Sequence, residues 1–537
     1  MRFFLWILFS SLFFPFGKVY CQQQFQVAYS DTSETNCVAI DYSLNGGYVL
    51  LNGSGTAGNS FAHIHKLTGS FQTDWSLTLS TSDSILLPVT SSETYDGSVI
   101  IASDAGSQNQ NSILLVKIDS SGSLVWSTKV DRTQYEVPKN ILPLPDGSFY
   151  VCGISNYNSG STQKDILLSK FSDAGQPLWA QIIGGTREED PAAIIRTTDD
   201  QLAVAGTSNS FSNGTNFFLS KLDTAGNYYW FITYPLGLND TCRSLLQTND
   251  GGYLLVGTGG NSGQDILIMK TDANGYLQFA RVFDLGFSSN SLLDDGYRIL
   301  STSDGGIAIA GTTCLSTSQS KFLFLIKMSQ NLVTEWFTSF GFQYSNKFSG
   351  ILQTPDNGYL ISGSRKNNLT NRMEGLLIKT DSLGVSRCFE TSLNKTDMVV
   401  NPLQFSVAPS SVPVTLAIHS DSVYVSASTQ VVDTSCYLVT AAKAEISAES
   451  QGMEIYPNPV LSSTKIFISS SPKIKGIFTW DMSDFSGRIV KRGLWNSSAE
   501  DQNLTIETIG MKPGIYCISL TCAEKGILLR KKVLVLK

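Results

Sequence analysis

The chain of 537 residues contains only three histidines, and this scarcity limits the chemistry that it can carry. No Ser-His-Asp set, Cys-His pair, phosphate loop or nucleotide fingerprint can be assembled from the sequence. His63 and His65 are two residues apart on an expected strand, so their side chains face the same side of it. A metal site there would need a third ligand that the sequence does not indicate. We therefore interpret both as ordinary strand residues, with a ligand pair as the alternative, and predict no metal and no cofactor.

Charge is also scarce, because charged residues make up only 15% of the chain and the formal net charge is −7. An acidic chain with no basic stripe and no motif of stacking aromatics is not expected to bind nucleic acid. Ser, Thr, Asn and Gly are abundant instead. This composition favours a β-rich extracellular surface over a cytosolic enzyme.

Long apolar runs are absent except near the N-terminus, where one extends from Phe3 to Phe16. Val19 and Cys21 are small enough for the −3 and −1 sites of a signal peptidase, which predicts a secretory signal peptide over residues 1–21. A membrane anchor is the weaker interpretation because the run is too short to span a bilayer. Tyr20 is bulky where lipoprotein signals need a small residue, so we do not expect Cys21 to be lipidated. We expect no transmembrane segment after the signal peptide is removed.

No segment shows sustained helical periodicity, but one pattern recurs seven times at intervals of roughly 50 residues. A lysine is followed nine residues later by an aromatic residue in six units and by a cysteine in the seventh. The pairs are Lys66 and Trp75, Lys117 and Trp126, Lys170 and Trp179, Lys221 and Trp230, Lys270 and Phe279, Lys327 and Trp336, and Lys379 and Cys388.

Each unit also contains turn signals and short apolar runs that together indicate four strands. Most units begin with Asp-Gly or Asn-Gly, as at Asp146-Gly147, and these dipeptides favour tight hairpin turns. Four short strands in about 50 residues are typical of a β-propeller blade. We therefore predict an all-β chain with a seven-bladed β-propeller over residues 22–391. A solenoid of stacked sheets is the alternative, although its repeats are generally shorter.

The recurring residues are expected to hold the blades together. The aromatic residue is predicted to pack between blades, and the lysine to lie along its strand with a solvated ammonium group. Residues 25–29 occupy the place of an aromatic strand at the start of the mature chain, and residues 386–389 occupy the same place at the end of the last unit. One of these segments is expected to complete a blade begun at the other terminus and so close the ring.

A set of carboxylates after the aromatic strands is the best candidate for a binding site in the propeller. Its members are Glu136, Asp190, Asp240 and Asp295, with Asn346 in the sixth unit. Ring symmetry would place them on one rim, where clustered carboxylates could bind cations or a polyhydroxylated ligand. The alternative is that they cap turns for local reasons, which Asp and Asn commonly do.

Eight cysteines remain if the signal peptide is removed after Cys21. Secretion permits disulfides, and Cys388 and Cys436 are the best candidate pair because they bracket the region that follows the propeller. Four others lie in strand-like runs and are interpreted as small buried residues: Cys152, Cys242, Cys314 and Cys517.

The periodicity ends near residue 391. Residues 392–452 are rich in Val, Ser, Thr and Pro and are predicted to be a β-rich linker or a small β segment. From residue 453 a new series of motifs begins and continues to the last residue. It comprises Tyr456-Pro457-Asn458-Pro459, a hairpin around Gly487, the sequence Pro513-Gly514-Ile515-Tyr516, and a basic and apolar end with Lys531, Lys532 and Lys537.

This order of motifs over residues 453–537 resembles the C-terminal sorting domain of proteins that the type IX secretion system of Bacteroidetes exports. The resemblance implies a small β-sandwich that the secretion machinery reads at the outer membrane, after which the cargo is released or anchored on the surface. It further implies that Tyr456 to Pro459 begin the sandwich and that Gly487 and Gly514 serve its turns. Residues 531–537 would form the terminal recognition strand. The propeller units are also similar to those of secreted proteins of the same bacteria, which implies an architecture and no activity.

The sequence therefore predicts a secreted or cell-surface propeller protein that reaches the outside by way of the periplasm. Its expected role is to bind or scaffold an extracellular glycan or protein, without enzymatic activity. A secreted carbohydrate-active hydrolase or lyase that uses the rim carboxylates is the alternative, because the two carboxylates of a glycosidase can be distant in sequence. That alternative predicts carboxylates with raised pKa values converging in the central funnel, whereas a binding module predicts a funnel of Ser, Thr and aliphatic residues.

Overall fold

The computed structural model describes residues 23–391 with gaps, and beyond residue 391 it describes the strands named below and Thr508. The gaps are residues 31–33, 57–58, 82–84, 107–110, 132–134, 157–162, 237–238, 260–264, 286–293, 315–320, 342–345, 368–369 and 387–389. The predicted signal peptide lies outside the described residues. No helix that could cross a membrane occurs in the described part of the chain.

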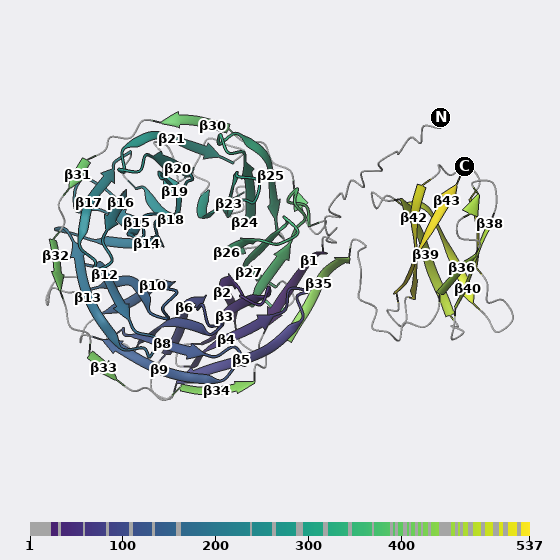
Figure 1. Cartoon of the computed structure of the whole chain (residues 1–537), viewed down its shortest axis with the longest axis horizontal. Helices are drawn as coiled ribbons and strands as arrows, with labels where there is room; N and C mark the ends of the chain where they lie inside the picture. The colour runs from purple at the N-terminus through teal and green to yellow at the C-terminus, as the bar shows by residue number, and fades with distance from the viewer. Residues whose placement is uncertain are drawn as a thin grey trace, which may run out of the picture. The chain divides into compact units, whose positions relative to one another are not determined.

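The described chain is all-β, and seven sheets form a closed ring of blades (Figure 1). The predicted propeller is therefore confirmed over the solenoid. The innermost strands, which surround the centre of the ring, are β2 (Thr35–Tyr42), β6 (Ile85–Glu93), β10 (Glu136–Pro143), β14 (Glu189–Arg196), β18 (Thr241–Gln247), β22 (Asp295–Ser301) and β26 (Asn346–Gln353). The second strands are β3 (Tyr48–Thr56), β7 (Val99–Gly106), β11 (Phe149–Ser155), β15 (Leu202–Ser208), β19 (Tyr253–Gly259), β23 (Ile307–Cys314) and β27 (Tyr359–Lys366).

The third and fourth strands of each blade carry the recurring lysine and aromatic residue. The third strands are β4 (Asn59–Leu67), β8 (Ile113–Ile118), β12 (Asp165–Phe171), β16 (Asn216–Leu222), β20 (Asp265–Thr271), β24 (Lys321–Met328) and β28 (Met373–Lys379). The fourth are β5 (Thr73–Thr81), β9 (Leu124–Asp131), β13 (Pro177–Gly184), β17 (Tyr228–Tyr234), β21 (Leu277–Asp284), β25 (Thr334–Phe340) and, in the last blade, β1 (Gln23–Ser30). All neighbouring strands within a blade are antiparallel.

Strand β1 closes the ring, as predicted for residues 25–29. It pairs with β28 so that Phe25 lies directly opposite Lys379. In the other blades each recurring lysine lies opposite its own aromatic residue, as Lys66 lies opposite Trp75. Phe25 therefore supplies the aromatic position of the seventh blade, where the sequence pattern has Cys388.

A fifth strand follows the outside of every blade, and these seven strands come from one segment after residue 389. They are β29 (Glu390–Thr391), β30 (Thr396–Val400), β31 (Phe405–Val407), β32 (Ser410–Pro413), β33 (Ala417–His419), β34 (Val423–Ala427) and β35 (Val431–Val439). They pair in turn with the fourth strands of blades six, five, four, three, two, one and seven. We call this segment the belt, and Figure 1 shows it running around the circumference of the ring.

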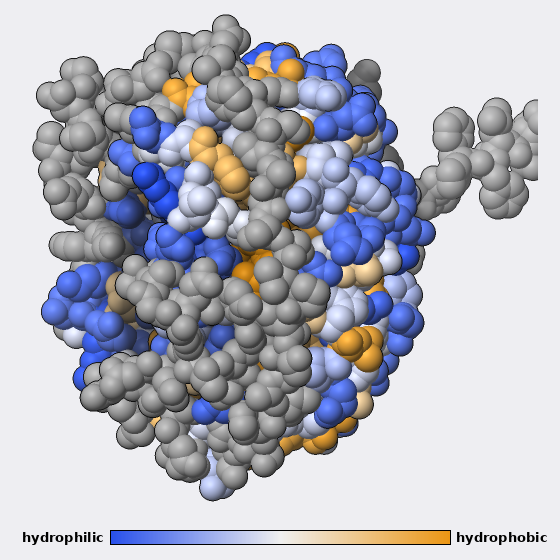
Figure 2. Space-filling model, turned by 90° about the vertical axis from the view of Figure 1, so that its left-hand side faces the viewer, coloured by the Kyte–Doolittle hydropathy of each residue, from blue (hydrophilic) through white to orange (hydrophobic). Residues whose placement is uncertain are grey.

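The belt extends the propeller unit beyond its predicted C-terminal boundary. The sequence pattern places that boundary at residue 391, but the compact unit extends from Gln23 to Leu438 because the belt is paired to the blades. On the side of the ring that carries blades three and four, the described surface is mainly hydrophilic, with small separate hydrophobic patches (Figure 2).

Five of the seven recurring lysines are buried and Lys170 and Lys221 are partly exposed, so the predicted solvated ammonium group is wrong for most blades. Lys66 is 2% exposed and Lys379 is 1% exposed. Lys379 forms an ion pair of 2.9 Å with Asp356, in the turn between the first two strands of its own blade, and donates to the carbonyl of Thr380 at 2.7 Å. Lys270 and Lys327 form the corresponding pairs in their blades. The ammonium group thus ties two hairpins of a blade together, since a buried charge must be paired.

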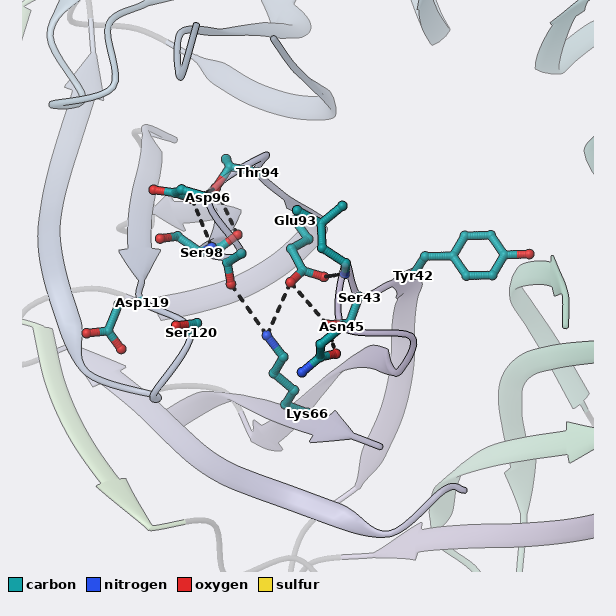
Figure 3. Close-up of polar contacts among 12 residues, drawn as sticks. Tyr42, Ser43, Asn45, Lys66, Glu93, Thr94, Asp96, Ser98, Asp119 and Ser120 are labelled. Carbon is teal, nitrogen blue, oxygen red and sulfur yellow. Dashed lines mark hydrogen bonds and ion pairs between the residues drawn. The ribbon is translucent and has the colours of Figure 1, made fainter. Parts of the chain in front are cut away.

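Lys66 shows a variant of this arrangement that crosses between blades (Figure 3). Its own turn carries Asn45 in place of the aspartate, and Lys66 instead pairs with Glu93 of the second blade at 3.2 Å. Glu93 also accepts a hydrogen bond from the backbone of Leu44 at 3.0 Å. The second blade is thereby joined to the turn of the first.

The predicted packing of the aromatic residues between blades is confirmed. The indole of Trp75 donates to the carbonyl of Ser120 in the next blade at 3.0 Å and covers Gly122, which has a left-handed φ of 89°. Cys152, Cys242 and Cys314 are buried, as predicted. Cys388 and the side chains of Cys436 and Cys517 lie outside the described residues.

The second compact unit contains residues 439–537, and its described strands form two sheets. One sheet contains β36 (Met453–Tyr456), β38 (Lys465–Ser470) and β41 (Leu504–Glu507). The other contains β37 (Val460–Leu461), β43 (Leu528–Leu536), β42 (Gly514–Cys522), β39 (Gly476–Asp484) and β40 (Ile489–Ser497). Buried side chains come from both sheets, among them Ile506, Met482 and Ile518.

Candidate functional site

Each innermost strand contains a β-bulge, and the seven bulged residues form one layer around the central channel. A bulge leaves one residue unpaired and redirects its side chain, as Lys139 shows between Pro138 and Asn140. The bulged residues in blade order are Val38, Val89, Lys139, Ala192, Arg243, Tyr297 and Ser349. The first two are aliphatic, whereas the layer becomes charged and aromatic in blades three, five and six.

Five of the bulged residues line a pocket of about 160 Å³ in this charged sector. Lys139 pairs with Asp190 of the neighbouring blade at 2.8 Å, and Arg243 pairs with Asp295 of the next blade at 3.2 Å. The guanidinium of Arg243 also lies 5.1 Å from the ring centroid of Tyr297. Burial raises the pKa of Tyr297 to about 12, so its hydroxyl remains protonated at neutral pH.

Arg298 lines the same pocket and forms no ion pair or side-chain hydrogen bond with the described residues. Desolvation by its surroundings lowers the pKa of its guanidinium. Lys347 is exposed at the position of β26 that corresponds to Asp190 and Asp295 in their strands. The sector therefore has four cations, Lys139, Arg243, Arg298 and Lys347, against the two carboxylates of Asp190 and Asp295, although the chain as a whole is acidic.

The predicted rim carboxylates occupy two different positions, and strand register separates them. Asp190 and Asp295 face the channel as described above. Glu136 and Asp240 lie one position earlier and are buried, at 1% and 0% exposure. Glu136 accepts a hydrogen bond from Ser155 at 2.9 Å, and Asp240 accepts one from the backbone of Leu236 at 3.3 Å.

The buried position recurs in the neighbouring blades. Glu189, Asp294 and Asn346 occupy it. Glu189 and Asp294 accept hydrogen bonds from backbone N–H groups in the segments before their strands, and the amide of Asn346 donates to the carbonyl of Lys321 at the start of β24. The adjacent acids Glu189-Asp190 and Asp294-Asp295 are the signal that could have revealed two separate positions. The sequence reasoning also missed Lys139, Arg243, Tyr297 and Arg298, because a bulge in a strand cannot be located from composition.

The two strand histidines are buried and hydrogen-bonded. His63 lies 2.6 Å from Ser54 Oγ and 2.9 Å from Thr78 Oγ1, and His65 Nδ1 lies 2.6 Å from Ser76 Oγ. Within the ranges that the structure describes, no three His, Cys, Asp or Glu side chains gather as a metal site would require.

Solved structures of several unrelated functions are similar to the chain, all at low identity. A polysaccharide lyase, Uly1, has 8% identity and a TM-score of 0.45, with 67% of this chain and 100% of that chain covered. PorZ, a surface component of the type IX secretion system of Porphyromonas gingivalis, has 9% identity and a TM-score of 0.25, covering 95% and 82%. A eukaryotic initiation factor has 10% identity and a TM-score of 0.34, covering 72% and 98%. No curated protein matches the sequence.

The C-terminal unit gives a specific match. Residues 454–535 match the family described as the secretion system C-terminal sorting domain, which confirms the resemblance drawn from the motifs over residues 453–537. In that unit the side chain of Tyr516 is buried and Gly514 begins β42, whereas the side chains of Tyr456 and Lys531 and all of Gly487 lie outside the described residues. The chain is thus a seven-bladed β-propeller protein of Bacteroidetes type that carries a C-terminal sorting domain for export by the type IX secretion system.

Proposed function

We propose that the chain is a secreted or surface-attached binding module without enzymatic activity, and that its central channel holds an anionic group of an extracellular glycan or protein. The observation that carries this proposal is the excess of cations in one sector of the channel, centred on Arg298. An unpaired charge in a desolvated site is costly, and a bound anion would remove that cost. Four cations against two carboxylates would also attract an anion into the channel of an otherwise acidic protein.

The channel carboxylates support binding over catalysis. A glycosidase needs two carboxyl groups on opposite sides of the scissile bond, one of them protonated. Asp190 and Asp295 are instead each held in an ion pair with a cation of the channel, Lys139 at 2.8 Å and Arg243 at 3.2 Å. The alternative, a hydrolase or lyase that uses these carboxylates, is therefore tested below by the assay for sugar release.

Export of the chain to the outside of the cell would take two steps. The apolar segment within residues 1–21 would direct the chain to the periplasm as a signal peptide. The sorting domain would then direct it through the type IX machinery to the surface or the medium.

A glycan array with acidic and neutral polysaccharides, run on the whole mature chain, tests the proposal together with a reducing-sugar release assay on the same polysaccharides. We expect binding of acidic glycans without release of sugars. Arg298→Met should weaken that binding at least ten-fold. Arg187→Met, which removes an exposed arginine outside the channel, should leave it unchanged.

Release of sugars would contradict the absence of enzymatic activity. Equal binding by the Arg298→Met variant would contradict the channel as the site. Binding of neutral glycans alone would contradict the anionic ligand, and no binding to any glycan would leave an acidic protein as the ligand class to be tested by affinity capture on the wild-type chain.

A further inference from the structure

A second pocket, of about 370 Å³, opens between blades three and four on the face that carries the regular hairpin turns. It lies between the turn of residues 144–148 in blade three and the turn of residues 197–201 in blade four. Its lining includes Leu144, Pro145, Asp146, Lys170, Arg196 and Asp200. It shares no residue with the channel pocket, and its volume lies within the range of roughly 300–1,000 Å³ that is usual for ligand sites.

The other blades show how this position is normally filled. Each recurring lysine except Lys170 forms an ion pair: Lys66 with Glu93, Lys117 with Asp96 and Asp173, Lys221 with Asp199, Lys270 with Asp250, Lys327 with Asp304, and Lys379 with Asp356. Among the described residues Lys170 has no such partner, and its ammonium group lies 5.4 Å from the ring centroid of Tyr150. Asp146 occupies the partner position in blade three, and a hydrogen bond from Ser148 together with the charge of Lys170 lowers the pKa of its carboxyl, but Lys170 and Asp146 do not form the ion pair that the other six blades have.

A second contact, a hydrogen bond between neighbouring blades, is also missing at the junction of blades three and four. At three other junctions the last residue of the innermost strand accepts a hydrogen bond from the backbone N–H of the preceding blade's turn. Glu93 accepts from Leu44, Gln247 from Thr198 and Gln353 from Ser303, at 3.0, 2.8 and 2.7 Å.

At the junction of blades three and four neither partner of that contact is available. The turn residue is Pro145, which has no N–H, and the strand residue is Arg196, which has no acceptor. Arg196 pairs instead with Asp200 of its own blade at 3.1 Å, and both side chains are largely exposed. The pocket is therefore built by specific residues of two units.

We propose that this second pocket binds a carboxylated sugar residue, such as a uronic acid of an acidic polysaccharide. Lys170 and Arg196 are placed to receive the sugar carboxylate, and the Asp146 and Asp200 carboxylates can accept hydrogen bonds from its hydroxyl groups. A ligand with a carboxylate and several hydroxyls matches a pocket that has two cations and two carboxylates. A simple anion would be repelled by the two aspartates.

Isothermal titration of trigalacturonate into the mature full-length chain tests the pocket. All measurements use an Arg298→Met background, so that the channel does not contribute. We expect binding that falls at least ten-fold with Lys170→Met and also with Arg196→Gln. Both changes are compatible with the fold, because Lys170 forms no ion pair and glutamine occupies the position of Arg196 in two other blades.

Two comparisons complete the experiment. The methyl ester of trigalacturonate should bind at least ten-fold more weakly, and Arg187→Met should bind as the background does. Equal binding by Lys170→Met or by the methyl ester would overturn the proposal, as would no binding of trigalacturonate in the Arg298→Met background. If the wild-type chain binds and that background does not, the channel proposal stands while the second site is refuted.

Discussion

Gly384 lies beneath the indole of Trp336 of the preceding blade, and the same pairing of glycine with tryptophan recurs around the ring. A Cβ atom built on Gly384 would lie 2.3 Å from the nearest indole carbon. The other pairs are Gly122 with Trp75, Gly175 with Trp126, Gly226 with Trp179, and Gly275 with Trp230. All five glycines have positive φ, so the turn conformation and the space above it both require glycine.

Two blades use a smaller aromatic residue, and there the glycine is replaced by a large side chain. Phe25 of the seventh blade lies 4.9 Å from the ring of Phe71 in the first. Phe279 of the fifth blade packs in the same apolar cluster as Leu332 of the sixth. Phe71 and Leu332 have φ angles of 62° and 59°, so they keep the turn conformation that glycine has elsewhere. At each of these two junctions, a smaller aromatic residue on one blade is therefore matched by a larger turn residue on the next.

Gly384→Ala should destabilise the propeller by roughly 2–4 kcal/mol, because it combines backbone strain with overpacking against Trp336. Gly46→Ala is the matched control, since Gly46 also has positive φ but no atom lies within 4 Å of the place that an alanine methyl group would take. Gly46→Ala should lower the free energy of unfolding by only about 1 kcal/mol. Chemical denaturation of both variants measures the difference, and equal losses would show that the indole contact contributes nothing.

Asp165 and Glu189 should give the propeller a pH-dependent stability. Both are buried, and desolvation together with the charge of Glu189 raises the pKa of Asp165 to about 7. A carboxyl that binds its proton more tightly in the folded state loses stability as pH rises from its unfolded pKa, near 4, through its folded pKa. Asp165→Asn should therefore raise stability at pH 8 and leave it unchanged at pH 4. Thermal unfolding across this range checks the effect, and a constant difference between variant and wild type would contradict it.

The belt is an element that the sequence pattern does not reveal. The blades were predictable because Lys, Trp and the Asp-Gly turns recur at one period, and each position has the same physical task in most blades. The belt strands are short and have no common motif, and they pair through backbone hydrogen bonds with strands that precede them by as many as several hundred residues. The same limit applies to the candidate site, where Asp190 and Asp295 were found from their type but Arg243 and Arg298 depend on bulges.

A chain that ends at residue 391 should be less stable and less soluble than one that ends at residue 438. The shorter chain keeps only β29 of the belt, so the outer edges of the other six blades would be exposed, and unpaired edge strands associate with one another. Size-exclusion chromatography and thermal unfolding of the two chains, each starting at residue 22, test this. If both are monomeric with the same unfolding temperature, the belt is not needed to protect the edges.

At the scale of the whole molecule the ring is closed twice at the same blade. Strand β1 completes the seventh blade from the N-terminal side, and β35 at the end of the belt then pairs with β1. The two ends of the propeller unit therefore meet in one sheet, and opening the seventh blade requires both to separate. Residues 23–438 are held as one structure by this closure.

The sorting domain should be separable from that closed structure without loss of its stability or binding. The chain divides into two compact units at residue 439, and the match to the sorting family lies wholly within the second. A chain of residues 22–438 should unfold at the same temperature as residues 22–537 and keep the acidic-glycan binding of the full chain.

A reporter that carries a signal peptide and residues 440–537 should reach the surface or medium of a host with the type IX system, while the same reporter without residues 440–537 stays inside. A lower unfolding temperature for the shorter chain would mean that the second unit stabilises the propeller, and failure of the reporter to leave the cell would mean that export needs the propeller as well.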